Sequence, residues 1–206
     1  MTPEAATHDR YQAALAEAQR FFMGEANVQA AARALAARLT ELGIPYAICG
    51  GLAVAAHGHV RVTADVDVLL TPEGLRQFKA RWLGRGWVER FPGSKGLTDA
   101  THGVKVDVLL TGDYPGDGKP KPVSFPDPAQ VALVRGDTAI LGLEPLVQLK
   151  LASGQSAAHR LQDLADVIAL IRANALPRDW SSRLDPSVRD KYQELWAAAQ
   201  VADDEA

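Results

Sequence analysis

This chain of 206 residues has a single cysteine, no long apolar run and a small net charge. The single cysteine, Cys49, cannot form a disulfide within the chain, which argues against a disulfide-stapled secreted domain and fits a reducing cytoplasm. No apolar run approaches the ~20 residues that a membrane-spanning helix needs. The N-terminus also lacks the basic-then-apolar pattern of a signal peptide. We therefore expect a soluble, cytoplasmic protein with no membrane partner.

The net charge is only −3 at pH 7, so no global signal marks a nucleic-acid-binding protein, and none points to DNA in particular. The charge is uneven, however, because residues 76–95 hold six basic residues and one acid. A solvated helix face is one interpretation of this basic run. A patch that meets a polyanion such as RNA is the other. The sequence leaves both open.

Hydrophobic periodicity predicts helices and short strands in alternation. The order indicates an α/β (α+β) fold, in which a small mixed β-sheet carries helical flanks at both ends. We expect helices over residues 8–23, 27–43, 52–58, 72–84, 144–153, 158–173 and 186–201. Strands are expected over residues 44–49, 64–70 and 104–110, and weaker ones over 130–134 and 138–141.

These elements suggest an N-terminal helical extension (1–43), a core (44–143) and a C-terminal helical region (144–206). Inside the core, residues 111–128 hold five prolines and three glycines, which excludes regular structure. A loop of this length is usually either functional or mobile.

The hexapeptide VDVLLT occurs twice, at residues 66–71 and 106–111. Side chains alternate along a strand, so Asp65 and Asp67 should share one face of the first copy while the valines face the core. Asp107 should lie on the corresponding face of the second copy. The flanking sequences differ, which argues against duplication of a larger unit. Two strands with the same need for a buried face and a carboxylate explain the repeat.

The three carboxylates converge if the two strands are neighbours, because Asp65 and Asp67 are ~6.6 Å apart along the strand and adjacent strands lie ~4.8 Å apart. Like charges this close repel, and a divalent cation removes the conflict. Hard oxygen ligands suit Mg²⁺. A D-x-D pair alone is weak, since exposed acids are common and some sugar transferases also use it.

The context of the pair is more specific. Gly50-Gly51 follows one strand and opens a short helix, and thirteen residues separate Gly51 from Asp65. The order C-G-G, thirteen residues, D-V-D-V and a later V-D-V resembles the DNA polymerase beta-type nucleotidyltransferase superfamily. The string GGLAVAAHGHVRVTADVDVLL resembles its small prokaryotic members, including toxin-type nucleotidyltransferases of the abortive-infection class. Residues 44–110 carry this resemblance.

The resemblance implies roles for the matched residues. Asp65, Asp67 and Asp107 would be the catalytic carboxylates and would hold Mg²⁺ (or Mn²⁺). Gly50 and Gly51 would position the phosphates of a nucleoside triphosphate such as ATP. The reaction would transfer a nucleoside monophosphate to a hydroxyl on RNA, a protein or a small molecule.

A weaker resemblance covers LVQLKLASGQSAAHRLQDLADVIAL, which is similar to the family's helical lysine followed by R-x-x-D-x-x-D. It implies nucleotide-binding roles for Lys150 and Asp163. Arg61 and Thr63, which flank the carboxylates, are further candidates. Plain alternatives remain for most of these residues: a surface arginine at 61, a solvated lysine at 150, and a surface ion pair between Arg160 and Asp163.

Two functions stay open. The leading one is an active nucleotidyltransferase, for which the role of toxin in a toxin–antitoxin pair, with a protein antitoxin as partner, is one expectation. The alternative is a non-catalytic member of the same fold that binds a nucleotide or a protein. A sugar transferase is disfavoured, because 206 residues leave little room for a nucleotide-sugar domain.

Overall fold

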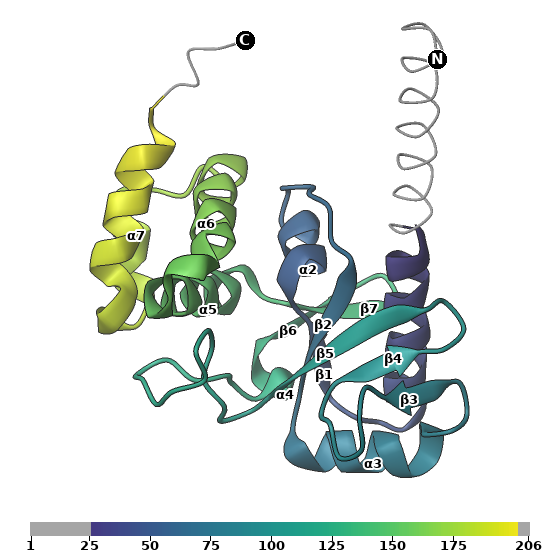
Figure 1. Cartoon of the computed structure of the whole chain (residues 1–206). Coiled ribbons are helices and arrows are strands. Elements are labelled where there is room, and N and C mark those ends of the chain that lie inside the picture. The colour runs from purple at the N-terminus through teal and green to yellow at the C-terminus, as the bar shows by residue number, and fades with distance from the viewer. Residues whose placement is uncertain (1–25, 202–206) are drawn as a thin grey trace, which may run out of the picture.

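The computed structural model describes residues 26–201, and a mixed seven-stranded sheet lies at its centre (Figure 1). The strand order is β3-β4-β5-β2-β1-β7-β6. Strands β2 and β5 pair in parallel, as do β1 and β7, and the other neighbours are antiparallel. The strands are β1 (Tyr46–Ile48), β2 (Asp65–Leu70), β3 (Trp87–Glu89), β4 (Leu97–Asp99), β5 (Val104–Leu110), β6 (Ala132–Arg135) and β7 (Thr138–Leu141).

Helices flank the sheet on both sides. Residues 26–41 are helical, and the chain turns after them at Gly43, whose φ of +64° suits glycine. The other helices are α2 (Gly50–Ala56), α3 (Pro72–Trp82), α4 (Pro128–Val131), α5 (Leu143–Ser156), α6 (Leu161–Ala173) and α7 (Pro186–Ala199), with short 3₁₀ turns η1 (Ala158–Arg160) and η2 (Arg178–Arg183). None of the helices described is long and apolar enough to cross a bilayer.

The two sheet faces are packed differently, and this decides where the polar side chains lie. One face packs against helix 26–41 and α3, and it contains Val66 and Val68 of β2 with Val106 and Val108 of β5. The other face packs against α2 and the helices α5–α7, which gather on one side of the molecule in Figure 1. Since side chains alternate along a strand, the aspartates between these valines point toward the second face.

The fold class is confirmed: the core is α/β, with a mixed sheet and helical flanks. The strand over 104–110 and the one over 138–141 have the predicted bounds, and most helices agree within a few residues. The expected helix over 8–23 lies outside the described residues. The short helix begins at Gly50 and not at residue 52, so both glycines belong to its first turn.

The prediction missed the hairpin of β3 and β4. Each strand has only three residues, which is too short for a period-two pattern to emerge. The hairpin extends the sheet beside β5, so it borders the strand that carries Asp107. The basic run 76–95 therefore covers α3, β3 and the turn that follows it.

Candidate active site

The three predicted carboxylates lie on two adjacent parallel strands. Asp67 of β2 is the register partner of Asp107 of β5, and Asp65 lies two residues earlier on the same face as Asp67. Val66 and Val68 bury the opposite face, so the packing of the sheet fixes the direction of all three carboxylates. The neighbouring strands and the shared face expected from the sequence are thus present in the fold.

Asp67 is the most strongly perturbed of the three. Burial, together with the negative charges of Asp65 and Asp107, raises the pKa of Asp67 to about 7, and the charge of Lys150 opposes this shift. Such a carboxylate cluster holds its charge only with a positive partner nearby. A cation bound beside these carboxylates would therefore favour the charged form of Asp67.

Gly50 lies directly against Asp67. Its φ is +56°, and a Cβ built on it would lie 1.8 Å from Asp67 Oδ2. Any side chain here would collide with the carboxylate as well as strain the backbone. Glycine is thus required at this position on two independent grounds.

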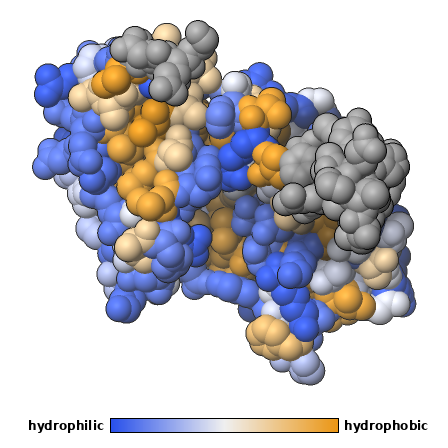
Figure 2. Space-filling view, turned by 45° about the horizontal axis from the view of Figure 1, so that its top comes forward, coloured by the Kyte–Doolittle hydropathy of each residue, from blue (hydrophilic) through white to orange (hydrophobic). Residues whose placement is uncertain are grey.

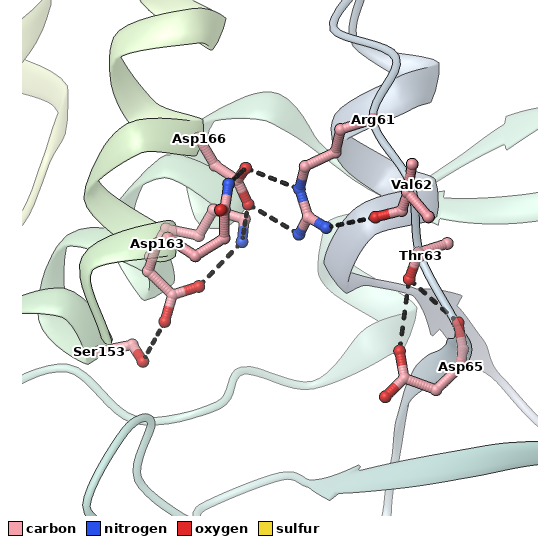
Figure 3. A network of polar contacts seen from close by, with 9 residues as sticks. Arg61, Val62, Thr63, Asp65, Ser153, Asp163 and Asp166 are labelled. Carbon is pink, nitrogen blue, oxygen red and sulfur yellow. Dashed lines mark hydrogen bonds and ion pairs between the residues drawn. The ribbon is translucent and has the colours of Figure 1, made fainter. Parts of the chain in front are cut away.

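Gly51 and Thr63 support the site from behind. A Cβ on Gly51 would lie 2.8 Å from Cβ of Thr63, so the missing side chain lets the segment before β2 pack on α2. The Thr63 hydroxyl in turn donates to Asp65 Oδ1 at 3.3 Å (Figure 3). Unlike Gly50, neither residue lines the cavity described below.

A second polar group joins α5, α6 and the segment before β2. Arg61 makes a two-pronged ion pair with Asp166, at 2.7 Å from Nε and 2.9 Å from Nη2 (Figure 3). Lys150 lies 2.7 Å from Asp166 and 3.0 Å from Asp163, and Ser153 donates to Asp163 at 2.6 Å. Lys150 is only 6% exposed, so the solvated-lysine interpretation is wrong.

The sequence left open a surface ion pair between Arg160 and Asp163, but Arg160 lies against another partner. Its guanidinium lies 3.4 Å from the carbonyl oxygen of Gly116, in the long loop. Asp163 points instead to Lys150 and Ser153, on the inner side of α6. The loop is thereby joined to the helices that carry the second polar group.

The two polar groups face one cavity of about 620 Å³. It lies between the sheet and the C-terminal helices, where Figure 2 shows a hollow bordered largely by polar residues. Predicted residues that line the cavity are Gly50, Arg61, Asp65, Asp67, Asp107, Lys150 and Asp163. Residues that the sequence did not suggest include Lys95, Tyr114, Gly116, Ser153, His159 and Gln162.

Two other residues, His57 and Cys49, have structural roles. His57 ends α2, and its Nε2 lies 2.8 Å from the carbonyl oxygen of Leu141, which fits a packing residue. Cys49 is buried and free, and burial raises the pKa of its thiol, so the thiol stays protonated.

The donor set fits Mg²⁺ or Mn²⁺ in its chemistry, since it consists of carboxylate oxygens beside a cavity. Among residues 26–201, however, no group of three or more His, Cys, Asp or Glu side chains is placed so that it could hold a metal ion. Asp107 has a cation beside it within the chain, because its Oδ1 is 2.6 Å from Nη2 of Arg90. The basic run thus places an arginine on the third carboxylate.

Comparison with known proteins gives structural likenesses only. No family model and no curated protein sequence matches the chain. Similar solved structures include a nucleotidyltransferase-like antigen from Paracoccidioides brasiliensis (17% identity, 72% of this chain and 77% of that chain, TM-score 0.48). Another is ANT(2″)-Ia in complex with adenylyl-2″-tobramycin (14% identity, 84% and 96%, TM-score 0.48). A third is a candidate nucleotidyltransferase from Thermotoga maritima (19% identity, 66% and 89%, TM-score 0.43).

Because every one of the three TM-scores is below 0.5, a function for this chain has to be supported by the geometry of its own site.

Proposed function

We propose that the protein is a metal-dependent nucleotidyltransferase that moves a nucleoside monophosphate from a nucleoside triphosphate to a hydroxyl acceptor. The observation that carries this proposal is the register of Asp67 with Asp107 on adjacent parallel strands, with Asp65 on the same face. Carboxylates placed in this way, beside a cavity that also holds a buried lysine, suit the polyphosphate chemistry of a nucleotide.

Asp65, Asp67 and Asp107 would hold Mg²⁺ or Mn²⁺. The bound metal would supply charge neutralisation at the phosphates and a lower pKa for a bound hydroxyl. Asp107, on β5, would orient the attacking hydroxyl, and Gly50 would let the phosphates approach the backbone without a steric clash. Lys150 would balance the charge of the phosphates from the side of α5. Arg61 would hold Asp166, and so keep α6 in position relative to β2.

The acceptor would enter past the loop that contains Tyr114 and Gly116, because both residues line the cavity. The cavity volume of about 620 Å³ is in the range of small-ligand sites. RNA ends, protein hydroxyls and aminoglycoside-like compounds are therefore the acceptors to supply in turn, together with α-³²P-labelled ATP, GTP, CTP or UTP and Mg²⁺.

Transfer of label would be the first test. Replacing Asp67 or Asp107 by Asn should lower transfer by ~10²-fold or more, since each removes one charged stabiliser of the transition state. Both variants keep the side-chain shape, so the melting temperature controls for folding. Transfer within a few-fold of the parent protein would remove these residues from the mechanism.

A non-catalytic nucleotide-binding module is the second candidate, and the ion pair between Arg90 and Asp107 favours it. In that case, nucleoside triphosphates would raise the melting temperature of the protein, but no pyrophosphate would be released, whichever acceptor is supplied. The same assay thus separates the two candidates. A toxin role for the active enzyme would show as growth arrest on expression that Asp67→Asn relieves.

A further inference from the structure

Arg90 follows strand β3, and its guanidinium reaches across the sheet to β5. Its Nη2 lies 2.6 Å from Asp107 Oδ1, and the two side chains are 28% and 42% exposed. The contact is a direct ion pair that water screens only in part. The sequence resemblance assigns Arg90 no role in the site.

Gly96 makes room for this guanidinium. The backbone N–H of Arg90 donates to the carbonyl oxygen of Gly96 at 3.2 Å. A Cβ on Gly96 would lie 3.1 Å from Nε and 3.2 Å from Cδ of Arg90. Gly96 is not among the glycines with positive φ, so its backbone conformation does not require glycine. An added Cβ would instead press on the Arg90 side chain, which would have to move by a few tenths of an ångström.

The turn that carries Arg90 is fixed on both sides by Lys79 of α3. The Lys79 ammonium donates to Glu89 at 2.7 Å and to the carbonyl oxygen of Ser94 at 2.6 Å. Lys95, at the end of the same turn, pairs with Asp113 at 2.9 Å. Of these three cations of the basic run, Arg90 is the one whose ion pair ends on a carboxylate of the site.

We propose that Arg90 is a positioning residue that competes with the metal ion for Asp107. This inference rests on the proposed function, and it adds a residue outside the resembled motif. A cation that takes Asp107 as a ligand has to displace the guanidinium, because both bind the same carboxylate. The pair lowers the affinity for metal and holds Asp107 in place until the metal arrives.

Mn²⁺ binding to the full chain, measured by calorimetry and by the paramagnetic signal of free Mn²⁺, tests the inference without any need for turnover. Arg90→Ala should bind Mn²⁺ about three- to five-fold more tightly than the parent protein, the range expected for release of a partly exposed ion pair. Gly96→Ala keeps the charge but pushes the guanidinium away, so it should shift the affinity in the same direction by a smaller factor. Circular dichroism melting checks that both variants fold.

Lys95→Ala is the matched control, because it removes one positive charge beside the same cavity without touching the pair with Asp107. Its affinity for Mn²⁺ should stay within about two-fold of the parent value, as expected for a screened surface charge. Equal tightening by Lys95→Ala and Arg90→Ala would show a general charge effect and overturn the inference.

Failure of the inference and failure of the proposed function give different results. If Asp107→Asn weakens Mn²⁺ binding but Arg90→Ala does not change it, the competition is refuted and the metal site stands. If the parent protein binds no Mn²⁺, or if Asp107→Asn binds it as well as the parent, the metal site itself is refuted and the competition with it.

Discussion

Asp67 shows how the site trades stability for chemistry. Its carboxylate is held between Asp65, Asp107 and the backbone of Gly50, and its pKa is raised from an ordinary value of 3.8 to about 7. The unfolded chain loses this proton at much lower pH than the folded chain does. Between about pH 4 and pH 7 the folded state therefore binds more protons, and its stability falls as the pH rises.

Asp67→Asn should consequently stabilise the protein at pH 8 while it abolishes transfer. The amide removes the buried negative charge, and a gain of about 1 kcal/mol would raise the melting temperature of a chain of this size by about 2–4 °C. At pH 4.5 Asp67 is protonated in the folded state, so the gain should almost vanish. Melting curves at the two pH values measure it, and a gain of the same size at both would refute this account.

A second prediction concerns the replacement of Gly50 by alanine, for which the same replacement at Gly43 is a matched control. Both glycines have positive φ, at +56° and +64°, but only Gly50 has the Asp67 carboxylate in the place of a Cβ. Gly43→Ala should cost about 1–2 kcal/mol of left-handed backbone strain and leave transfer unchanged. Gly50→Ala should cost more and should also displace Asp67, so that transfer is lost. Urea denaturation and the transfer assay separate the two effects, and equal behaviour of the two variants would contradict the geometry.

Among the elements, the ones predicted best are those whose burial pattern is local. Strand β5 agreed with its prediction because three valines alternate with Lys105 and Asp107 along it. The hairpin of β3 and β4 was missed because each strand has three residues and packs mainly through Trp87 and Leu97.

The residues of the site also fall into those that the sequence could reveal and those that it could not. Asp65, Asp67, Asp107 and Gly50 could be found from spacing, since one strand–helix–strand unit and its neighbour position all four. Arg90 could not, because its contact with Asp107 joins residues seventeen positions apart through a hairpin that the sequence did not reveal. The basic run was the only signal, and it did not distinguish Arg90 from Arg85 or Lys95.

The buried carboxylate of Asp166 links helix α6 to Arg61, in the segment before β2. Asp166 is fully buried, and burial alone would raise its pKa, but the Arg61 hydrogen bond and the charge of Lys150 outweigh this and lower it. A carboxyl group with a lowered pKa stabilises the fold above its unfolded pKa of about 4. This stabilisation is lost as the pH falls through the lower, folded value.

Asp166→Asn should therefore destabilise the protein by about 3 kcal/mol at pH 7, because it leaves two cations without their shared partner. The difference from the parent should shrink in strong acid, where Asp166 is protonated as well. Glu41→Gln, which breaks the exposed pair between Arg38 and Glu41, is the control and should change stability by less than about 0.5 kcal/mol. Urea denaturation at pH 7 and at decreasing pH measures both, and a loss for Asp166→Asn no larger than the control would show that the network adds nothing.

At the scale of the whole molecule, the cavity is built from segments far apart in the chain. Its walls come from β2, from the loop at residues 114–118 and from α5 and α6. The loop is attached to α5, because Gly116 leaves room for Ser156 and the Ser156 hydroxyl accepts a hydrogen bond from the N–H of Asp117 at 3.2 Å. A ligand in the cavity thus touches the sheet, the loop and the C-terminal helices together.

ATP with Mg²⁺ should accordingly slow amide hydrogen exchange in three separated segments, residues 65–67, 114–118 and 150–163. At ligand concentrations about 100-fold above Kd, binding stabilises the folded state by about 2.7 kcal/mol, which should also raise the melting temperature. The turn of the β6–β7 hairpin, residues 134–138, lines no part of this cavity and serves as the internal control. Amide exchange measured with and without ligand tests this prediction. If protection is confined to one of the three segments, or is equally strong in the control hairpin, the nucleotide does not bind between the sheet and the C-terminal helices.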